Sequence, residues 1–365
     1  MKTIQDIFQA YAPKYLETFG DKIPGQHEKV IKAILKCKTP GCGAVVFLCK
    51  HCKTTHSVPL GCGNRHCPGC QHSKSSEWLE RQTLNQLPGA HFMVTFTVPK
   101  ELRGFIRSNP KLGYKELFSA SSNALKTLAA DSKFSGGAVS GFMGVLHTWG
   151  RLLQYHPHIH YLIPGGTLSK DKTKWLPTGN KFYLPVHALS KIFRGKMKDA
   201  FRAAGVLDQI PGEVWSQPWN VNCKPVGNGE FTLKYLAPYV FRVAIANSRI
   251  LKVEHDKVHI SYKKSGSKRL RTLVLSAIEF MRRFLQHVLP SGFMKIRYFG
   301  FMSSNFSLPL EKIRELIQTS GACTAKEIQK IATVLQSSIS LVCPDCGGEL
   351  SLLGIIFPEC NSPSG

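Results

Sequence analysis

Cysteine spacing is the feature that most constrains how this chain can fold. Seven of its twelve cysteines lie between Cys37 and Cys70. Within that segment, Cys49-x2-Cys52 and Cys67-x2-Cys70 are two knuckles separated by fourteen residues, and each turns tightly enough to present two thiolates to one ion. Four thiolates complete a tetrahedral shell. The spacing therefore predicts a structural zinc held by these four cysteines.

Five further metal-binding side chains share the segment and predict a second zinc without identifying its ligands. Any four of the five provide enough donors. They are Cys37, Cys42, His56, Cys62 and His66. Structural zinc contributes on the order of 10 kcal/mol of folding free energy in small domains. We expect one or two Zn²⁺ ions in a zinc-binding, DNA-recognising domain over residues 1–86.

The C-terminal end carries one more knuckle, Cys343-Pro-Asp-Cys346. A zinc ribbon needs two such knuckles. Within the tail, the remaining donors are Cys360 and Cys323. The expected region is a helical tail over 306–365 with a zinc knuckle whose partner the spacing does not supply.

Charge points to a polyanionic partner. The formal net charge is +25 and the sequence pI is about 9.7, an imbalance for which nucleic acid is the commonest explanation and an acidic membrane surface the alternative. The sequence has no apolar run of about 20 residues that would span a bilayer, and its start lacks the apolar core of a signal peptide. We expect a cytoplasmic, nucleoid-associated protein, in whose reducing surroundings cysteines bind metal rather than form disulfides.

Hydrophobic periodicity predicts an α+β fold, with an antiparallel sheet flanked by helices over residues 87–305. Strands are expected over 91–98, 141–149, 158–163, 250–262, 269–275 and 294–299. Helices are expected over 4–19, 27–35, 75–86, 101–131 with a break at Asn109-Pro110, 187–203, 235–248 and from Ser276 to His287. The segment 37–72 is expected to consist of turns and metal knuckles.

A histidine pair provides the main chemical signal of this middle region. His158 and His160 flank Ile159 at the start of an expected strand, so both imidazoles face the same side and form half of a divalent-cation site. His147, on the preceding strand of a hairpin, is favoured as third ligand, and His156 is the alternative. Leu162 occupies the position where hydrolytic zinc sites often carry an acidic ligand, which disfavours that chemistry.

Two tyrosines follow, four residues apart. Tyr235 and Tyr239 would lie one turn apart on one helix face, with Pro238 in the first turn, where proline is tolerated. A phenol with a pKa near 10 is a poor nucleophile at neutral pH. A Mg²⁺ or Mn²⁺ ion can neutralise and orient a phosphodiester for attack. Together, the histidines and tyrosines predict cleavage of DNA through a 5′-phosphotyrosine.

Basic side chains beyond the tyrosines are candidates for phosphate contacts. These contacts would bind the DNA backbone with strong salt dependence and no sequence preference. The candidates are Arg242, Arg249, Lys263, Lys264, Lys268, Arg269 and Arg271, with Arg282 and Arg283 as further ones.

Four stretches in order along the chain resemble one known family. Cys62-Gly-Asn-Arg-His-Cys-Pro-Gly-Cys-Gln71 resembles its zinc motif, and His156-Pro-His-Ile-His160 its metal motif. Residues 235–249 resemble its nucleophile helix, and residues 280–298 the stretch beyond it. The family is that of the zinc-finger-bearing HUH (His-hydrophobe-His) transposases of rolling-circle insertion sequences, the IS91 type.

The resemblance implies an HUH-endonuclease core that nicks single-stranded DNA at transposon ends and transfers it to a target. It assigns metal binding to His158 and His160, and nucleophile status to Tyr235 and Tyr239. Two alternatives remain open at this stage. One is a non-catalytic zinc-finger protein that binds nucleic acid. The other is a replication initiator or relaxase that uses the same chemistry.

Overall fold

The computed structural model describes residues 3–131, 133–134, 139–181, 183–241, 244–264, 266–267, 269–322 and 341–357. It divides into two compact units. One comprises Met1–Ser75, Phe241–Val288 and Leu335–Gly365, and the other Ser76–Val240 and Leu289–Val334. Neither unit is continuous in sequence, so they differ from the consecutive domains expected over 1–86, 87–305 and 306–365. The first unit combines parts of all three because a strand of the tail pairs with a strand of the N-terminal segment, and the helix at 277–285 contacts the first helix of the chain.

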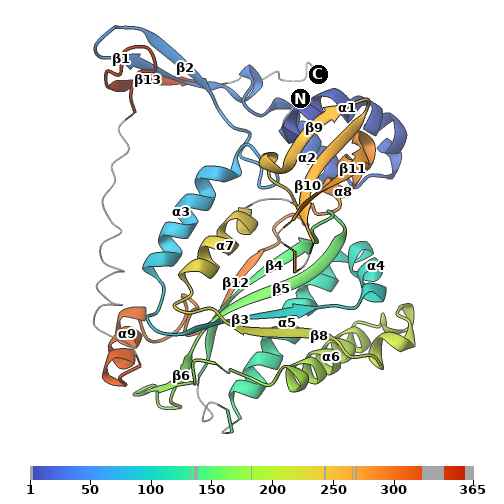
Figure 1. Cartoon of the computed structure of the whole chain (residues 1–365), viewed down its shortest axis with the longest axis vertical. Coiled ribbons are helices and arrows are strands. Elements are labelled where there is room, and N and C mark those ends of the chain that lie inside the picture. The colour runs from blue at the N-terminus through green and yellow to red at the C-terminus, as the bar shows by residue number, and fades with distance from the viewer. Residues whose placement is uncertain are drawn as a thin grey trace, which may run out of the picture. The chain divides into compact units, whose positions relative to one another are not determined.

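A five-stranded antiparallel sheet organises the second unit (Figure 1). Its strands are β3 (His91–Thr97), β4 (Gly141–Trp149), β5 (Tyr155–Pro164), β8 (Asn220–Pro225) and β12 (Ile296–Gly300). They follow the order β12-β4-β5-β3-β8. β4 and β5 form the expected hairpin at the centre of the sheet, and β4 is buried along its whole length. This confirms the predicted antiparallel α+β core.

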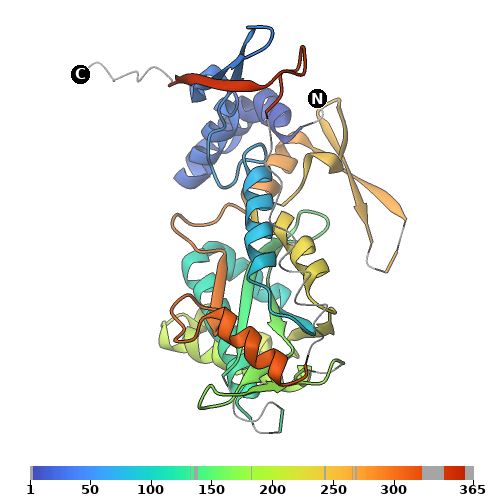
Figure 2. The same cartoon turned by 90° about the vertical axis from the view of Figure 1, so that its left-hand side faces the viewer.

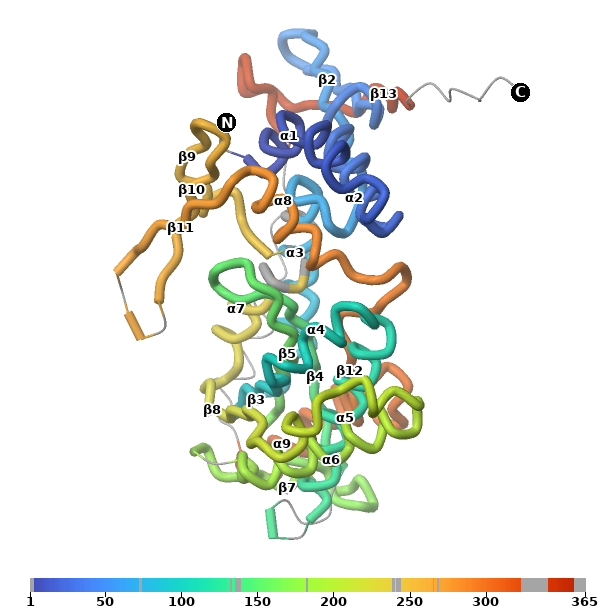
Figure 3. Tube along the Cα trace, turned by 90° about the vertical axis from the view of Figure 1, so that its right-hand side faces the viewer, coloured from blue at the N-terminus to red at the C-terminus, as the bar shows by residue number. Residues whose placement is uncertain are grey.

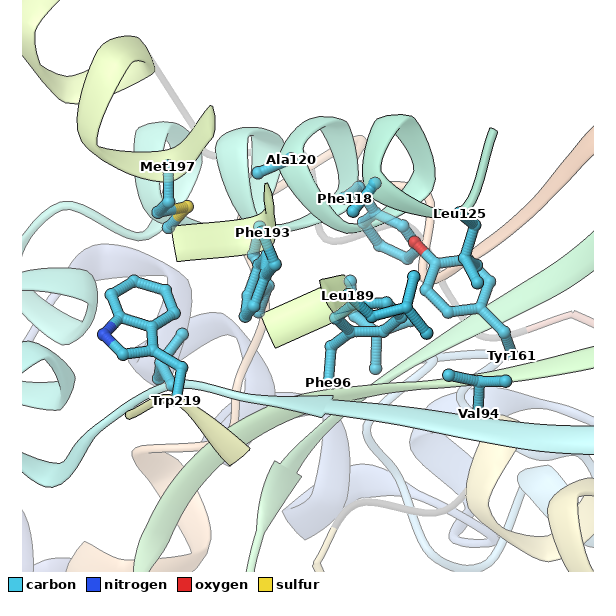
Figure 4. Packing of buried hydrophobic residues seen from close by; sticks show 14 of the residues in the cluster. Val94, Phe96, Phe118, Ala120, Leu125, Tyr161, Leu189, Phe193, Met197 and Trp219 are labelled. Carbon is cyan, nitrogen blue, oxygen red and sulfur yellow. The ribbon is translucent and has the colours of Figure 1, made fainter. Parts of the chain in front are cut away.

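Helices cover one face of this sheet and form the main hydrophobic core (Figure 4). They are α4 (Lys100–Ser108), α5 (Pro110–Ala129) and α6 (Val186–Ala203). Pro110 opens α5, where its missing N–H costs no helical hydrogen bond, which explains the predicted break. The Phe96 ring packs edge-on against Phe193 of α6 and Tyr161 of β5, with centroids 5.1 and 5.8 Å away. Alternate residues of β3 and β5 therefore point into this core.

The second unit also contains shorter elements and a second apolar cluster. The elements are β6 (Gly166–Leu168), β7 (Trp175–Pro177), α7 (Glu230–Phe241) and α9 (Leu310–Thr319). The cluster consists of Leu87, Leu168, Trp175, Phe301, Ile313 and Ile317. The helix α3 (Gln71–Leu84) runs across the boundary between the two units. The prediction for α7 was wrong in its bounds, because the helix starts five residues before Tyr235 and is not described beyond Phe241.

In the first unit, the described residues include the helices α1 (Ile4–Phe19), α2 (Gly25–Lys36) and α8 (Ala277–Leu285) and a three-stranded sheet. The Thr3 hydroxyl and the Asp6 carboxylate form a reciprocal capping box at the start of α1. The sheet contains β9 (Ile250–Glu254), β10 (Lys257–Lys263) and β11 (Leu270–Ser276), traced in Figure 3. The single strand expected over 250–262 is thus two strands, joined by a turn in which His255 and Asp256 both have positive φ.

A second small sheet in this unit joins the two ends of the chain. Its strands are β1 (Ala44–Cys49), β2 (Thr55–Pro59) and β13 (Leu350–Ile356). β13, red in Figure 2, pairs antiparallel with β1, which also pairs with β2. The segment 37–72, expected to hold only turns and knuckles, therefore contains a β-hairpin. Among the described residues, no helix combines the length and apolarity that crossing a bilayer requires.

Gly144 tests the packing of the main core, and the exposed Gly104 provides a comparison. A Cβ added to Gly144 on β4 would lie 2.5 Å from a ring carbon of Tyr161, whereas one on Gly104, exposed on α4, would meet nothing within 4 Å. We expect Gly144→Ala to lower the free energy of unfolding by about 1–3 kcal/mol through overpacking. Gly104→Ala should raise it by about 0.5–1 kcal/mol. Urea unfolding monitored by circular dichroism measures both. Equal stability of Gly144→Ala and the wild type would contradict the packing of Tyr161 against β4.

Candidate functional site

Three imidazoles meet on the sheet face opposite α5. His147 of β4 is the register partner of His158 on β5, and His160 follows two residues later on the same face. One ring nitrogen from each of these residues lies within 4.8 Å of the other two, and all three side chains are buried. The ring centroid of His160 lies 4.5 Å from that of His147 and 4.8 Å from that of His158. The structure thus brings the three favoured residues together.

His156, the alternative third ligand, is not part of this group. Its ring centroid lies 4.9 Å from that of His158, but the metal-competent group found among the described residues contains only His147, His158 and His160 at this place. Its backbone has another role, because the carbonyl of His156 lies 2.6 Å from Nδ1 of His158. A carbonyl can only accept, so Nδ1 of His158 carries the proton, and its Nε2 has the lone pair a cation needs.

The strand β3, which pairs with β5 on the side away from β4, orients the imidazole of His160. Thr95 is the register partner of His160, and its hydroxyl lies 2.8 Å from His160 Nδ1. This hydrogen bond fixes the ring orientation and directs Nε2 away from Thr95. Sequence reasoning missed Thr95, because no local pattern identifies a residue on a neighbouring strand.

Burial keeps these imidazoles neutral. It lowers the pKa of His158 to about 4 and holds the pKa values of His147 and His160 well below the usual 6.5, with the neighbouring imidazoles adding to the effect for the latter two. A neutral imidazole is the form that binds a metal. The cluster therefore presents three uncharged nitrogen donors at neutral pH.

Tyr235 of α7 lies beside the cluster. Its ring centroid is 6.5 Å from that of His160, with the rings nearly perpendicular, and the side chain is 48 % exposed. Tyr239 lies one turn further along the same helix, and its side chain is outside the described residues. Because α7 begins at Glu230, Pro238 is its ninth residue and not part of its first turn as predicted. Pro238 has no N–H to donate to the carbonyl of Lys234.

An arginine that the sequence did not single out completes the surroundings. Arg103 of α4 is close enough that its charge adds to burial in lowering the pKa values of His156 and His158. Partial burial also lowers the pKa of Arg103 itself, although the group stays charged at neutral pH. The site therefore combines neutral metal-competent nitrogens, a phenol and a nearby fixed positive charge.

The predicted phosphate-contacting residues lie in the first unit or outside the described residues. Lys263, Lys264, Arg269 and Arg271 are exposed at the end of the β10–β11 hairpin. Arg249 lies in the short helical turn Asn247–Arg249 and donates from Nε to the carbonyl of Ser261. Arg282 and Arg283 both bind the carboxylate of Glu279. Arg242 and Lys268 are outside the described residues.

The cysteines form two groups, and the predicted tetrad is not one of them. Cys67 and Cys70 lie with Cys37 and Cys62. Cys49 and Cys52 lie instead with Cys343 and Cys346 of the tail. The two knuckles separate because β1 carries the first one to β13, whereas a hydrogen bond from Lys38 N–H to the Leu60 carbonyl joins the loops around Cys37 and Cys62.

The remaining predicted zinc ligands lie outside these two groups. Cys42 approaches the Lys36 carbonyl at 3.1 Å, and His66 is buried. His56 lies with Cys343 and Asp345 in a smaller candidate group. Of the two cysteines considered as partners for the tail knuckle, Cys323 and Cys360 are both outside the described residues.

Comparison with known proteins finds two family models that match consecutive parts of the chain. Residues 7–98 match the family model described as "Transposase zinc-binding domain", and residues 141–307 match the one described as "Putative transposase". The first range contains the group of Cys37, Cys62, Cys67 and Cys70. The second contains the three imidazoles and Tyr235.

Two curated relatives cover most of the chain. It is 34 % identical over 336 residues to "Putative transposase y4qJ" of Sinorhizobium fredii (strain NBRC 101917 / NGR234), spanning 86 % of this chain and 84 % of the relative. It is 25 % identical over 298 residues to "Transposase for insertion sequence element IS801" of Pseudomonas savastanoi pv. phaseolicola, spanning 76 % and 70 % of the two chains. No solved structure matches the chain.

Proposed function

This chain belongs to the family of zinc-bearing transposases of the IS91 type, and from that premise we propose that it cuts and rejoins single-stranded DNA through a 5′-phosphotyrosine during rolling-circle transposition. One observation carries the proposal. The half-exposed phenol of Tyr235 lies beside a buried cluster of three neutral imidazoles in the same compact unit. A nucleophile and a metal-competent site in such proximity are what tyrosine transesterification requires.

The donor set of His147, His158 and His160 fits a divalent cation. Three neutral nitrogens on two rigid paired strands are pre-arranged, and two of the rings are oriented, His160 by its hydrogen bond with Thr95 and His158 by donating from Nδ1 to the His156 carbonyl. A bound Mn²⁺ or Mg²⁺ would neutralise charge on the phosphoryl oxygens and orient the phosphate in line with the nucleophile. Because imidazole ligands favour transition metals over Mg²⁺, we propose Mn²⁺ as the better fit of the two.

The tyrosine carries out the bond exchange. The phenol loses its proton to solvent, its oxygen bonds to phosphorus, and the P–O3′ bond breaks, with the 3′ oxygen taking up a proton to leave as a hydroxyl. One phosphodiester replaces another, so the reverse attack by a 3′-hydroxyl rejoins the strand without ATP. Arg103 supplies fixed positive charge for the phosphate. Tyr239, one turn along α7, would make a second transfer while Tyr235 is loaded.

Two surfaces fit single-stranded DNA. In the second unit, a pocket of about 1020 Å³ is lined by Trp78, Arg81, Tyr298 and Phe299 among others, and the exposed ring of Tyr298 would give an unstacked base an aromatic face in a pocket that also holds a cation. In the first unit, the exposed basic residues of the β10–β11 hairpin suit phosphate contacts. Neither surface requires a paired duplex.

The covalent adduct is the decisive prediction. Single-stranded oligonucleotides that tile the DNA flanking the gene are incubated with Mn²⁺ and the full chain, and adducts are separated on denaturing gels. A label at the 3′ end should remain on the protein, whereas a label at the 5′ end should leave on a free fragment. Tyr235→Phe with Tyr239→Phe should abolish the adduct. Tyr262→Phe, which changes a tyrosine of β10, should preserve it.

Two other outcomes of the adduct experiment would contradict the proposal in part or in full. An adduct that persists in the double variant would move the nucleophile to another residue. No adduct from the wild type with either metal would refute the catalytic proposal and leave a non-catalytic nucleic-acid-binding protein. The single variants show which tyrosine acts first.

We predict that Mn²⁺ binding depends on the three clustered histidines and not on the neighbouring His156. We expect His147→Ala, His158→Ala and His160→Ala each to weaken Mn²⁺ binding by at least about 10-fold, and Thr95→Val to weaken it by about 10-fold through loss of ring orientation. His156→Ala, on the same strand, is the matched control and should change affinity by less, because His156 is outside the metal-competent group and the variant keeps the backbone carbonyl that bonds to His158. Electron paramagnetic resonance titration of free Mn²⁺ measures this. A larger loss for His156→Ala than for His147→Ala would reverse the ligand assignment.

A further inference from the structure

We propose that the tail completes a second zinc site with the N-terminal segment, formed by Cys49, Cys52, Cys343 and Cys346. Their four sulfurs all lie within 4.8 Å of one another. Sγ of Cys49 lies 3.5 Å from Sγ of Cys346, and Sγ of Cys52 lies 3.7 Å from Sγ of Cys343. With Zn–S bonds of about 2.3 Å, tetrahedral geometry separates the sulfurs by about 3.8 Å. The thiols are thus spaced as ligands of one ion.

The two knuckles have the same backbone form although almost 300 residues separate them. In the first, the N–H of Lys53 donates to the carbonyl of Cys49, whose own N–H donates to Thr54. In the second, Gly347 and Gly348 make the corresponding bonds with Cys343. The residue after the second cysteine has positive φ in both, 58° at Lys53 and 74° at Gly347. Each turn therefore directs two thiols to one side.

The second knuckle is shaped to approach the first closely. A Cβ on Gly348 would lie 2.7 Å from Cβ of His51 and 3.1 Å from Sγ of Cys49, so only glycine fits there. Lys50 and Glu349 form an ion pair at 2.9 Å beside this contact. Nε2 of His56 lies 3.2 Å from Sγ of Cys343, where an N–H would stabilise a thiolate. These contacts hold the tail knuckle against the first knuckle and against β2.

A metal ion bound by these cysteines would explain how β13 stays paired with β1. No residue of β13 is buried, and several of its apolar side chains are exposed, including Leu352 and Leu353. Burial of apolar area therefore supplies little of the binding of β13 to β1, which depends on backbone pairing along one edge. Cys49 is the last residue of β1, so a zinc at this point fixes the end of the β1–β13 pair. The resulting zinc ribbon is assembled from the two ends of the chain.

The test uses cobalt in place of zinc, because thiolate-to-cobalt absorption reports cysteine sites and not imidazole sites. The full chain is expressed in cobalt-supplemented medium, and metal content and absorption are measured after gel filtration. We expect Cys343→Ser with Cys346→Ser to lose about half of the thiolate–cobalt absorption, because one of two four-cysteine sites is removed. Cys42→Ser with Cys223→Ser is the matched control, since neither residue belongs to a cysteine group, and it should retain the full signal.

Hydrogen exchange provides a second measurement that does not depend on how well the variant binds metal elsewhere. Residues 350–356 should lose protection in the Cys343→Ser/Cys346→Ser variant while β3, β4 and β5 retain it. Full thiolate–cobalt absorption in that variant, or unchanged protection of β13, would overturn the proposal. The site is independent of DNA cleavage, so an absent DNA adduct has no bearing on this outcome.

Discussion

The register of the β4–β5 hairpin is the constraint on which the candidate site depends. Successive strand residues face opposite sides, so a slip of one residue would put His147 on the face away from His158 and His160. The opposite face fixes the register through the core. There the Tyr161 hydroxyl meets Ser121 of α5 at 2.7 Å, and the Phe142 ring packs edge-on against Tyr161. The packed core on one face thus determines the metal-competent group on the other.

The burial of the imidazoles and the exposure of the tyrosine complement one another. Removing the histidines from water keeps them neutral, which prepares them for a cation and makes a lasting positive charge on the rings unfavourable. The half-exposed Tyr235 is accessible to a substrate too large to enter a closed cavity. Arg103 adds a positive charge whose partial burial reduces its screening by solvent. In the proposed reaction this charge would attract the phosphodiester of the substrate strand.

The sequence correctly predicts those elements that local periodicity and spacing specify. It predicted α1 with the observed bounds, and the strand pair that holds His147 opposite His158, because periodicity and spacing encode these features. Prediction from the sequence failed where contacts between segments far apart in the chain determine the structure. A Cys-x2-Cys pair predicts a turn but not its partner, so Cys49 and Cys52 were grouped with the nearest knuckle and not with the tail. Tyrosine spacing shows which residues share a helix face but not where the helix starts, so it predicts a start at Tyr235 instead of Glu230. Thr95 escapes prediction because only strand pairing brings it to His160.

The long separation of the two knuckles along the chain adds only a small entropic cost to the proposed second zinc site. The entropic cost of closing a flexible loop grows only with the logarithm of its length, by about 0.6 kcal/mol for each doubling. Here β1 and β13 belong to the same compact unit and pair with one another, so Cys343 and Cys49 lie on segments that already share a fold. What remains is to hold one exposed strand, and metal–thiolate bonds do this without a hydrophobic core. Because the imidazole cluster belongs to the other compact unit, loss of this zinc would release β13 and leave the β4–β5 register in place.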